Sequence, residues 1–169
     1  MGALISDQYR AVMAEMHESI AQFGTHDIHY APTAREMTEW GEKSLLSYGA
    51  GKGALARRLG PQYAVTNYDP GVPGMAARPE PHDVVMCLDV MEHVEPDCVD
   101  AVLADIRRCA REKAVIAVHT CAAIKFLPDG RNTHLTQRPP EWWRERVEAA
   151  GFTVEHEHRA EKEVMLICK

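Results

Sequence analysis

The chain has 169 residues and a mass of 18.9 kDa, with 46% apolar and 26% charged residues. This size predicts a single domain, and the net charge of −6 argues against a protein that coats nucleic acid, which would carry a basic excess. Every apolar run is shorter than the roughly 20 residues that a bilayer requires, so no membrane-spanning segment is expected.

The beginning of the chain and its cysteines bear on its compartment. Residues 1–10 lack a basic stretch followed by an apolar one, which argues against a secretory signal. The five cysteines are widely spaced and include no Cys-x-x-Cys pair, which argues against a disulfide framework or a zinc ribbon. We therefore expect reduced cysteines and a cytoplasmic location.

Residues 1–42 are expected to form two helices. Ser6 can cap the first helix, in which apolar residues recur every three or four positions until Gly24. The second helix is predicted over residues 33–40. Neither helix has an apolar partner nearby in the sequence, so both should pack on a core formed by later residues.

From residue 43 onward, short apolar runs alternate with helical patterns. Parallel strands are predicted at residues 44–48, 63–67, 83–88 and 114–119, and helices at residues 54–59, 97–110 and 140–150. Two final strands, 152–156 and 164–168, are joined by a short polar turn and should be antiparallel. The pattern predicts an α/β fold: an open, mostly parallel sheet with an antiparallel strand pair at its C-terminal end.

Two segments depart from regular alternation. Residues 69–83 contain four prolines and two glycines, which leave no room for a crossover helix and a further strand, so we expect a truncated sheet edge. Such an open edge could pair with a second subunit. Residues 120–139 form a long loop without periodicity, and loops of that length in a compact domain are often functional.

Glycines follow the first parallel strand directly. Gly49, Gly51 and Gly53 permit a sharp turn and let a ligand approach main-chain N–H groups, and the start of the next helix would favour a carboxylate or phosphate. Asp69 ends the next strand, where an acidic residue can accept hydrogen bonds from both hydroxyls of a ribose. This spacing predicts a ribose-bearing cofactor, either a dinucleotide or S-adenosylmethionine.

In their order and spacing, these motifs resemble those of class I S-adenosylmethionine-dependent methyltransferases. The resemblance covers residues 43–169: residues 47–53 resemble the first motif, and Tyr68-Asp69-Pro70 resembles the acidic end of the second strand. Residues 83–94 resemble the fourth-strand motif of the branch that contains ubiquinone-biosynthesis O-methyltransferases. The resemblance implies a Rossmann-like fold, one methyltransferase domain over residues 1–169 with its cofactor core in 43–169, and S-adenosylmethionine as the cofactor.

The resemblance also implies roles for individual residues. The cofactor-binding residues would be Tyr48, Gly49, Ala50, Gly51 and Gly53 for the methionine part, Asp69 for the ribose, and Leu88 and Asp89 beside the amino-acid end. Ser47 departs from the family, which usually has an acid there, and the family's third strand is missing between Pro70 and His82. Tyr68, Met75 or Met86 could supply apolar contacts to the adenine.

Candidate catalytic residues lie beyond the third predicted strand and in the long loop. His134 is a candidate general base, because a neutral imidazole can take a proton from a hydroxyl or an amine near pH 7. Glu92 and His93, together with Asp89 and His134, are similar to the E-x-x-E-H and distant-His arrangement of small-RNA 2′-O-methyltransferases, which would imply a divalent cation. Alternatively, the Glu-His pair only fixes the loop after the strand.

Other polar residues are weaker candidates for the same cleft. They are Arg131 and Asn132, His119 and Thr120, and the group His26, Asp27 and His29.

The first functional hypothesis is methyl transfer from S-adenosylmethionine to an oxygen or nitrogen nucleophile of a small acceptor, giving S-adenosylhomocysteine as the second product. A 2′-O or other nucleic-acid methyltransferase with a divalent cation is an alternative. The chain lacks the N/D-P-P-Y/F motif typical of amino-methylases, which argues against an exocyclic amine of a DNA base as the acceptor. A catalytically inactive relative that binds the cofactor is another alternative. A nicotinamide oxidoreductase ranks third, because the glycine spacing departs from G-x-G-x-x-G.

Overall fold

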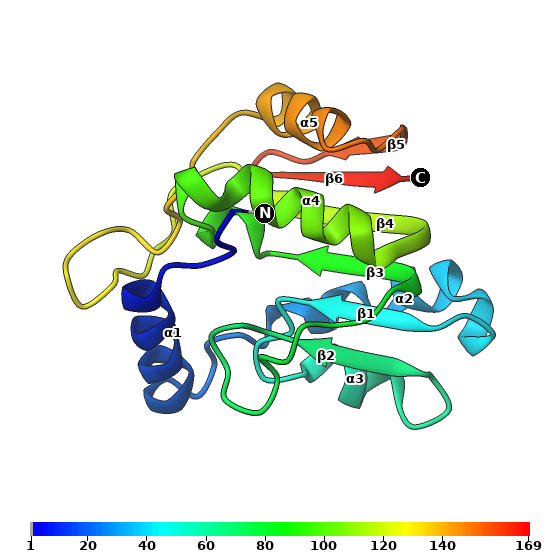
Figure 1. The fold of residues 1–169 in the computed structure, drawn as a ribbon, viewed down its shortest axis with the longest axis horizontal. Coiled ribbons are helices and arrows are strands. Elements are labelled where there is room, and N and C mark those ends of the chain that lie inside the picture. The colour runs from blue at the N-terminus through cyan, green and yellow to red at the C-terminus, as the bar shows by residue number, and fades with distance from the viewer. Residues whose placement is uncertain (1) are drawn as a thin grey trace.

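The computed structural model describes residues 2–169, in which a six-stranded sheet lies between two layers of helices (Figure 1). The strand order is β2-β1-β3-β4-β6-β5. The parallel strands are β1 (Leu45–Tyr48), β2 (Val65–Tyr68), β3 (His82–Leu88) and β4 (Ala110–His119); β6 (Glu163–Cys168) pairs antiparallel with β4, and β5 (Val154–Arg159) pairs antiparallel with β6. The predicted fold class is therefore confirmed.

Both faces of the sheet are buried, which explains the continuous apolar strands. Helices α4 (Val99–Cys109) and α5 (Pro140–Ala149) cover one face, and α2 (Ala31–Met37) and α3 (Ala54–Leu59) cover the other (Figure 1). Neighbouring strand residues divide between the two layers, so that Leu45 packs with α2 and α3 whereas Leu46 packs with α4. This alternation of successive side chains between the two faces is the period of two that a pleated strand imposes.

The edge formed by β2 is short, as the prolines predict. Between β2 and β3, residues 69–81 of the described chain contain no helix or strand. Instead, Asp69 N–H donates to the Met75 carbonyl at 3.0 Å, and Met75 N–H donates to the Val72 carbonyl at 3.0 Å, which closes a compact turn. Pairing of this edge with a second copy stays a prediction.

The N-terminal helices differ in part from expectation. Helix α1 (Asp7–Ser19) is capped as predicted, because Ser6 Oγ accepts the Tyr9 N–H at 3.1 Å. The second helix is displaced from the predicted range and ends at Met37, followed by a 3₁₀ turn (Glu39–Gly41). Trp40 within that turn has φ 60°, a left-handed conformation that cannot continue an α-helix.

Three further 3₁₀ turns complete the described elements: η1 (His26–Tyr30), η3 (Met91–His93) and η4 (Pro96–Cys98). The turn η4 replaces the first residues of the helix predicted over 97–110. Strand β4 begins earlier than predicted, since Ala110 pairs with His82. Among residues 2–169, no helix has the length and apolar character needed to cross a membrane.

Helix α1 and the loop 120–139 lie at the end of the sheet where the parallel strands finish (Figure 1). The Ser6 N–H and hydroxyl both donate to the Glu95 carboxylate at 2.8 Å, which fixes the start of α1. Lys52 Nζ donates to the Ile20 carbonyl at 2.8 Å, which fixes the chain just past its end. Leu127 from the loop packs with the buried side of α1 in a small separate core.

Candidate functional site

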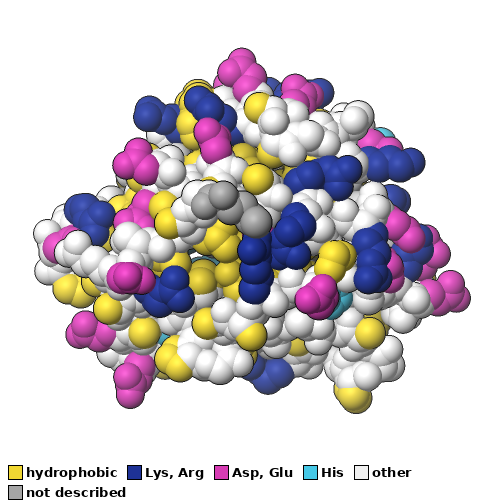
Figure 2. Space-filling model, viewed as in Figure 1, with side chains coloured by type: hydrophobic (Ala, Val, Ile, Leu, Met, Phe, Trp, Pro, Cys, Tyr) yellow, Lys and Arg dark blue, Asp and Glu magenta, His cyan; other side chains and the backbone are white. Residues whose placement is uncertain are grey.

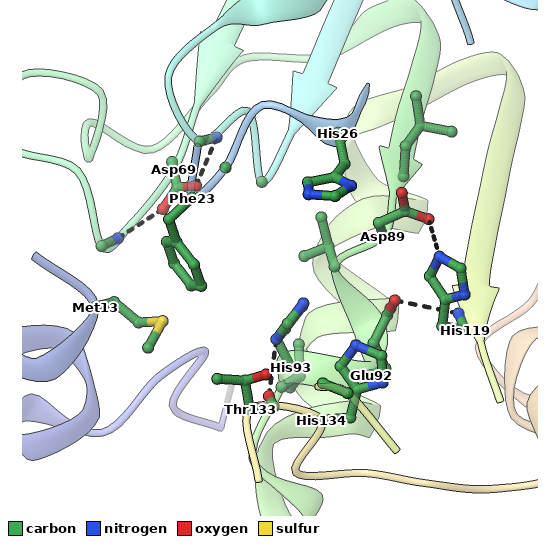
Figure 3. Close-up of a pocket in the computed structure, with 18 of the residues that line it drawn as sticks. Met13, Phe23, His26, Asp69, Asp89, Glu92, His93, His119, Thr133 and His134 are labelled. Atoms are coloured by element: carbon green, nitrogen blue, oxygen red, sulfur yellow. Dashed lines mark hydrogen bonds and ion pairs between the residues drawn. The ribbon is translucent and has the colours of Figure 1, made fainter. Parts of the chain in front are cut away.

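A pocket of about 460 Å³ lies at the ends of β1 and β3, beneath α1 and the loop 120–139. This volume is in the range of small-ligand sites. Figure 2 shows apolar side chains exposed in a hollow on this side of the molecule, and Figure 3 shows residues that line the pocket. The pocket lies at the carboxyl ends of parallel strands, where open α/β sheets bind ligands.

The glycine loop after β1 is held by hydrogen bonds within the chain. The N–H groups of Gly49 and Ala50 donate to the Tyr68 carbonyl at 2.8 and 2.9 Å. Gly51 has φ 51°, and a Cβ added to it would lie 2.5 Å from the Gly24 carbonyl oxygen. The glycines therefore allow the loop to approach the chain after α1. The N–H groups of all three glycines already have partners within the chain, since Gly51 donates to Asp69 and Gly53 donates to the Ala50 carbonyl.

Asp69 is fixed at the end of β2 in the pocket wall (Figure 3). Its Oδ2 accepts the Gly51 N–H and its Oδ1 accepts the Gly71 N–H, each at 2.9 Å. A carboxylate has about four acceptor positions, so each oxygen retains a lone pair after these bonds. The side chain is thus oriented by backbone and still able to accept hydrogen bonds from a ligand.

The start of α3 is already occupied by a carboxylate of this chain. Asp27 is buried, and its Oδ2 accepts the Leu55 N–H at 3.2 Å. Among the described residues its Oδ1 has no hydrogen-bond partner, and burial raises the pKa of the carboxyl to about 6. Asp27 therefore occupies the anion site expected at this helix start. Because Asp27 lies far from α3 in the sequence, no local pattern of residues indicates that it caps this helix.

The structure brings most of the expected cofactor residues to the pocket. Its wall includes Tyr48, Gly49, Ala50, Gly51, Asp69, Leu88 and Asp89, whereas Gly53 lies outside it. The three residues considered for adenine contacts, Tyr68, Met75 and Met86, do not line the pocket either. Apolar lining comes instead from Met13, Phe23 and Pro70 (Met13 and Phe23 are labelled in Figure 3).

Two histidines meet on the opposite side of the pocket, one after β3 and one in the long loop (Figure 3). The ring of His93 donates from Nδ1 to the Thr133 carbonyl at 2.8 Å, and the ring of His134 donates from Nδ1 to the Cys121 carbonyl at 2.6 Å. The ring centroids are 4.9 Å apart. Burial, and secondly the neighbouring His134, lower the pKa of His93 to about 4, so its imidazole is neutral near pH 7.

Glu92 lies beside these histidines and is fully buried. Its Oε1 accepts the His119 N–H at 3.1 Å, while its Oε2 has no hydrogen-bond partner among residues 2–169. Burial raises the pKa of the Glu92 carboxyl to about 8. An unpartnered buried carboxylate oxygen is costly and rare in folded proteins, and such an atom calls for a functional explanation.

Asp89 belongs to a different cluster, which corrects the predicted set of four cation ligands. Its Oδ1 accepts the Tyr30 hydroxyl at 3.1 Å and lies 3.6 Å from His119 Nε2. The same Tyr30 hydroxyl lies 2.8 Å from Glu163 Oε2. Tyr30 and Glu163 were not anticipated, because Glu163 reaches this position only through its pairing with His119 across β4 and β6.

The long loop positions His134 through its own side chains. Asn132 Oδ1 accepts the N–H groups of Ala123 and His134, each at 3.0 Å. Arg131 is exposed and pairs with Asp129 at 2.7 Å. Asn132 therefore organises the loop, and of the weaker candidates for the cleft neither Arg131 nor Asn132 lines the pocket.

Comparison with known proteins places this geometry in context. A family model described as a methyltransferase domain matches residues 38–157. No curated protein sequence gives a significant match. Among solved structures, the chain is similar to a Burkholderia thailandensis 1,6-didemethyltoxoflavin N1-methyltransferase bound to that substrate and S-adenosylhomocysteine, with 17% identity, a TM-score of 0.72, and coverage of 99% of this chain and 92% of the other.

Two further structures agree in fold. A DhpI complex with S-adenosylhomocysteine has 20% identity and a TM-score of 0.66, with 95% of each chain covered. The magnesium protoporphyrin IX methyltransferase of Synechocystis PCC 6803, bound to S-adenosylmethionine, has 16% identity and a TM-score of 0.63, with 99% of each chain covered. At these identities the similarity establishes the fold.

Proposed function

This chain belongs to the methyltransferase domain family, and on that premise we propose that it transfers a methyl group from S-adenosylmethionine to an oxygen or nitrogen nucleophile of a small polar acceptor. The observation that carries the proposal is a single pocket with the glycine loop and Asp69 on one side and Glu92, His93 and His134 on the other. One side suits a ribose-bearing cofactor, and the other suits removal of a proton.

The cofactor side fits S-adenosylmethionine by the chemistry of its walls. Asp69 keeps lone pairs for the ribose hydroxyls, and Met13 and Phe23 offer apolar surface for a base. Leu88 and Asp89 lie at the end of β3 and would face the amino-acid part. When bound, the cofactor supplies a methyl group already activated by its sulfonium, so the protein mainly has to align the acceptor and remove a proton.

The histidine side would receive the acceptor. Because the Nδ1 atoms of His93 and His134 donate to backbone carbonyls, the Nε2 atoms of the neutral rings carry free lone pairs. His134 is our candidate for the group that removes the acceptor proton, with Glu92 and His93 beside it. Burial lowers the pKa of His134, which keeps its imidazole neutral and able to accept a proton.

A small acceptor is favoured over nucleic acid. The net charge is −6, and the site is a pocket covered by α1 and the loop rather than an open basic groove. The Burkholderia neighbour was solved with a small heterocyclic substrate. Methylation of a nucleic-acid 2′-hydroxyl is the alternative that the Glu92, His93 and His134 cluster supports. Five unpaired cysteines support a cytoplasmic location, and the ubiquinone-related branch stays a prediction.

The proposal is tested first by calorimetric titration of S-adenosylhomocysteine into the purified protein. We expect micromolar binding. A panel of small phenols, hydroxy-heterocycles and amines, with an RNA oligonucleotide as a further acceptor, is then assayed for formation of S-adenosylhomocysteine. Absence of cofactor binding would overturn the proposal, whereas binding without turnover on any acceptor would identify an inactive relative.

A further inference from the structure

Asp27 is a buried carboxylate in the wall of the pocket, and one of its oxygens is unused. The residue is 6% exposed, and its Oδ2 accepts the Leu55 N–H at 3.2 Å, which holds the side chain against the start of α3. Its Oδ1 has no hydrogen-bond partner among residues 2–169. A buried polar atom costs free energy unless a hydrogen bond completes it. Asp27 is therefore held in place by the fold and still has an acceptor atom for a ligand.

The charges around Asp27 leave this carboxylate short of a cation. Burial raises the pKa of the Asp27 carboxyl to about 6, and the charge of Asp89 adds to that effect. Arg57 acts in the opposite direction, but it is exposed, and its guanidinium donates to the Lys52 carbonyl. Asp27 and Asp89 therefore repel each other, and a positive group of a ligand bound beside them would relieve that repulsion.

Asp27 lies on the side of the pocket where the amino-acid part of the cofactor is expected. Asp69, the candidate ribose ligand, accepts the N–H of Gly51 in the middle of the glycine loop, whereas Asp27 bonds just beyond the end of that loop. Figure 3 shows His26, the chain neighbour of Asp27, beside Asp89 and apart from Asp69. Because the charge of Asp89 also acts on the pKa of Asp27, the two acids border the same region, beyond the ribose position.

Ser47, on the same side of the sheet, favours a charged Asp27. Successive residues of β1 alternate between its two faces, so Ser47 lies on the same face as Leu45, the face that α2 and α3 cover. Ser47 is buried, and Asp27 bonds the start of α3 in that same layer. The acid that related proteins usually have at this position would add a further buried carboxylate, and close carboxylates cannot all stay ionised. The neutral serine therefore leaves the buried negative charge of this layer to Asp27.

We infer that the unpaired oxygen of Asp27 accepts a hydrogen bond from the α-ammonium group of S-adenosylmethionine. The inference rests on the proposed function, because it requires that cofactor in the pocket. A hydrogen bond from an ammonium group to a carboxylate is charge-assisted and stronger than a neutral one. Asp27 and Asp89 together would repel the carboxylate of the cofactor, so the ammonium group is the end that faces them. Asp27 is thus a binding residue whose charge destabilises the free protein but contributes affinity in the complex.

The experiment compares three ligands by calorimetry at pH 7.5, where Asp27 is ionised. They are S-adenosylhomocysteine, its deamino analogue, which lacks only the ammonium group, and 5′-methylthioadenosine, which lacks the whole amino-acid part. The wild type should bind S-adenosylhomocysteine about 10- to 100-fold more tightly than the deamino analogue. Asp27→Asn should weaken binding of S-adenosylhomocysteine by a similar factor. The same variant should bind the other two ligands no more weakly than the wild type does, because neither carries an ammonium group.

Asp83→Asn is the matched control, because Asp83 also accepts a main-chain N–H, that of Ser44, but lies outside the pocket at the start of β3. It should bind S-adenosylhomocysteine as the wild type does, and circular dichroism confirms that both variants are folded.

Four outcomes would overturn the inference. An unchanged affinity of Asp27→Asn for S-adenosylhomocysteine, or an equal loss of affinity for 5′-methylthioadenosine, would exclude the ammonium contact. Equal affinities of the wild type for S-adenosylhomocysteine and its deamino analogue would exclude it without any variant. These three results leave the proposed function standing, whereas absence of S-adenosylhomocysteine binding to the wild type would overturn both.

Discussion

The cofactor side and the histidine side of the pocket satisfy their polar groups in different ways. On the cofactor side, backbone amides bond within the chain, so that Gly49 and Ala50 donate to a carbonyl and Gly51 donates to Asp69. On the histidine side, Glu92 keeps an oxygen without a donor in the described chain, and two imidazoles keep free nitrogens. The first side has a geometry fixed before any ligand binds, whereas the second depends on a ligand to complete it.

The largest effect is expected on the histidine side. Replacing His134 with Ala should lower kcat by about 10²- to 10⁴-fold, the usual contribution of a positioned acid–base group, once an acceptor is known. The affinity for S-adenosylhomocysteine should stay nearly unchanged, because Asp69 and the glycine loop are untouched. His156→Ala, which removes an exposed histidine, is the control. Unchanged turnover would remove His134 from the mechanism.

Replacing Gly51 with Ala should distort the glycine loop on the cofactor side and destabilise the fold. The new Cβ would lie 2.5 Å from the Gly24 carbonyl oxygen at a φ of 51°. Overpacking and left-handed strain together should cost about 3 kcal/mol of unfolding free energy, or roughly 10 °C in Tm.

Gly74→Ala is the matched control for this substitution. Gly74 has φ 90°, but nothing lies within 4 Å of an added Cβ, so only the backbone strain should be felt. The difference between the melting temperatures of the two variants then measures the loss of stability caused by the close approach of the new Cβ to Gly24. Equal melting temperatures would show that the loop relaxes without loss.

Asp69 tests whether the fixed geometry serves the cofactor. Asp69→Ala removes a charged acceptor and should weaken S-adenosylhomocysteine binding by about 10- to 100-fold, as expected for hydrogen bonds to a charged group. Calorimetry measures the change, with Asp129→Ala as a control, because Asp129 lies on the surface and pairs with Arg131. An unaltered Kd would place the ribose elsewhere.

The smallest effect concerns Asp27 and depends on pH. Its pKa of about 6 in the folded protein is above its ordinary value because of burial, so ionisation of this carboxyl destabilises the fold. The contribution of the Asp27 carboxyl to the free energy of unfolding is fully favourable below the ordinary pKa of the group, and it is lost as the pH rises through about 6. Asp27→Asn keeps an acceptor for Leu55 N–H and removes the charge.

We therefore expect Asp27→Asn to raise the free energy of unfolding by up to about 2 kcal/mol at pH 7.5 and by little at pH 4. Urea denaturation at the two pH values, for the variant and the wild type, measures the difference. A variant that is less stable than the wild type at pH 7.5 would show that the negative charge at the start of α3 outweighs the cost of its burial.

The sequence was sufficient for the sheet and for much of the cofactor side. Continuous apolar runs predict strands buried on both faces, and the prolines after Asp69 predict the missing strand. Asp69 could be placed because the ends of neighbouring parallel strands meet at one edge. These features depend on local pattern and on the simple topology of parallel strands.

The features that the sequence left hidden depend on contacts between distant segments. Asp27 caps a helix that begins many residues later, and Glu163 reaches Asp89 only because β6 pairs with β4. Asp89 itself looked like a partner of Glu92 by spacing, yet its φ of 55° accompanies a side chain turned toward Tyr30. Backbone conformation at a strand end is invisible in a pattern of residue types.

The attachment of α1 at both ends determines how a ligand reaches the pocket. Ser6 is bonded to Glu95 at the start of the helix, and Lys52 is bonded to the Ile20 carbonyl beyond its end, so α1 has no loose end about which to swing. The opposite wall has an exposed tip, with Ile124 97% and Phe126 63% exposed. We therefore expect the cofactor and the acceptor to enter and leave the pocket beside this tip. Substitutions in the tip should change the rate of product release more than substitutions in α1 do.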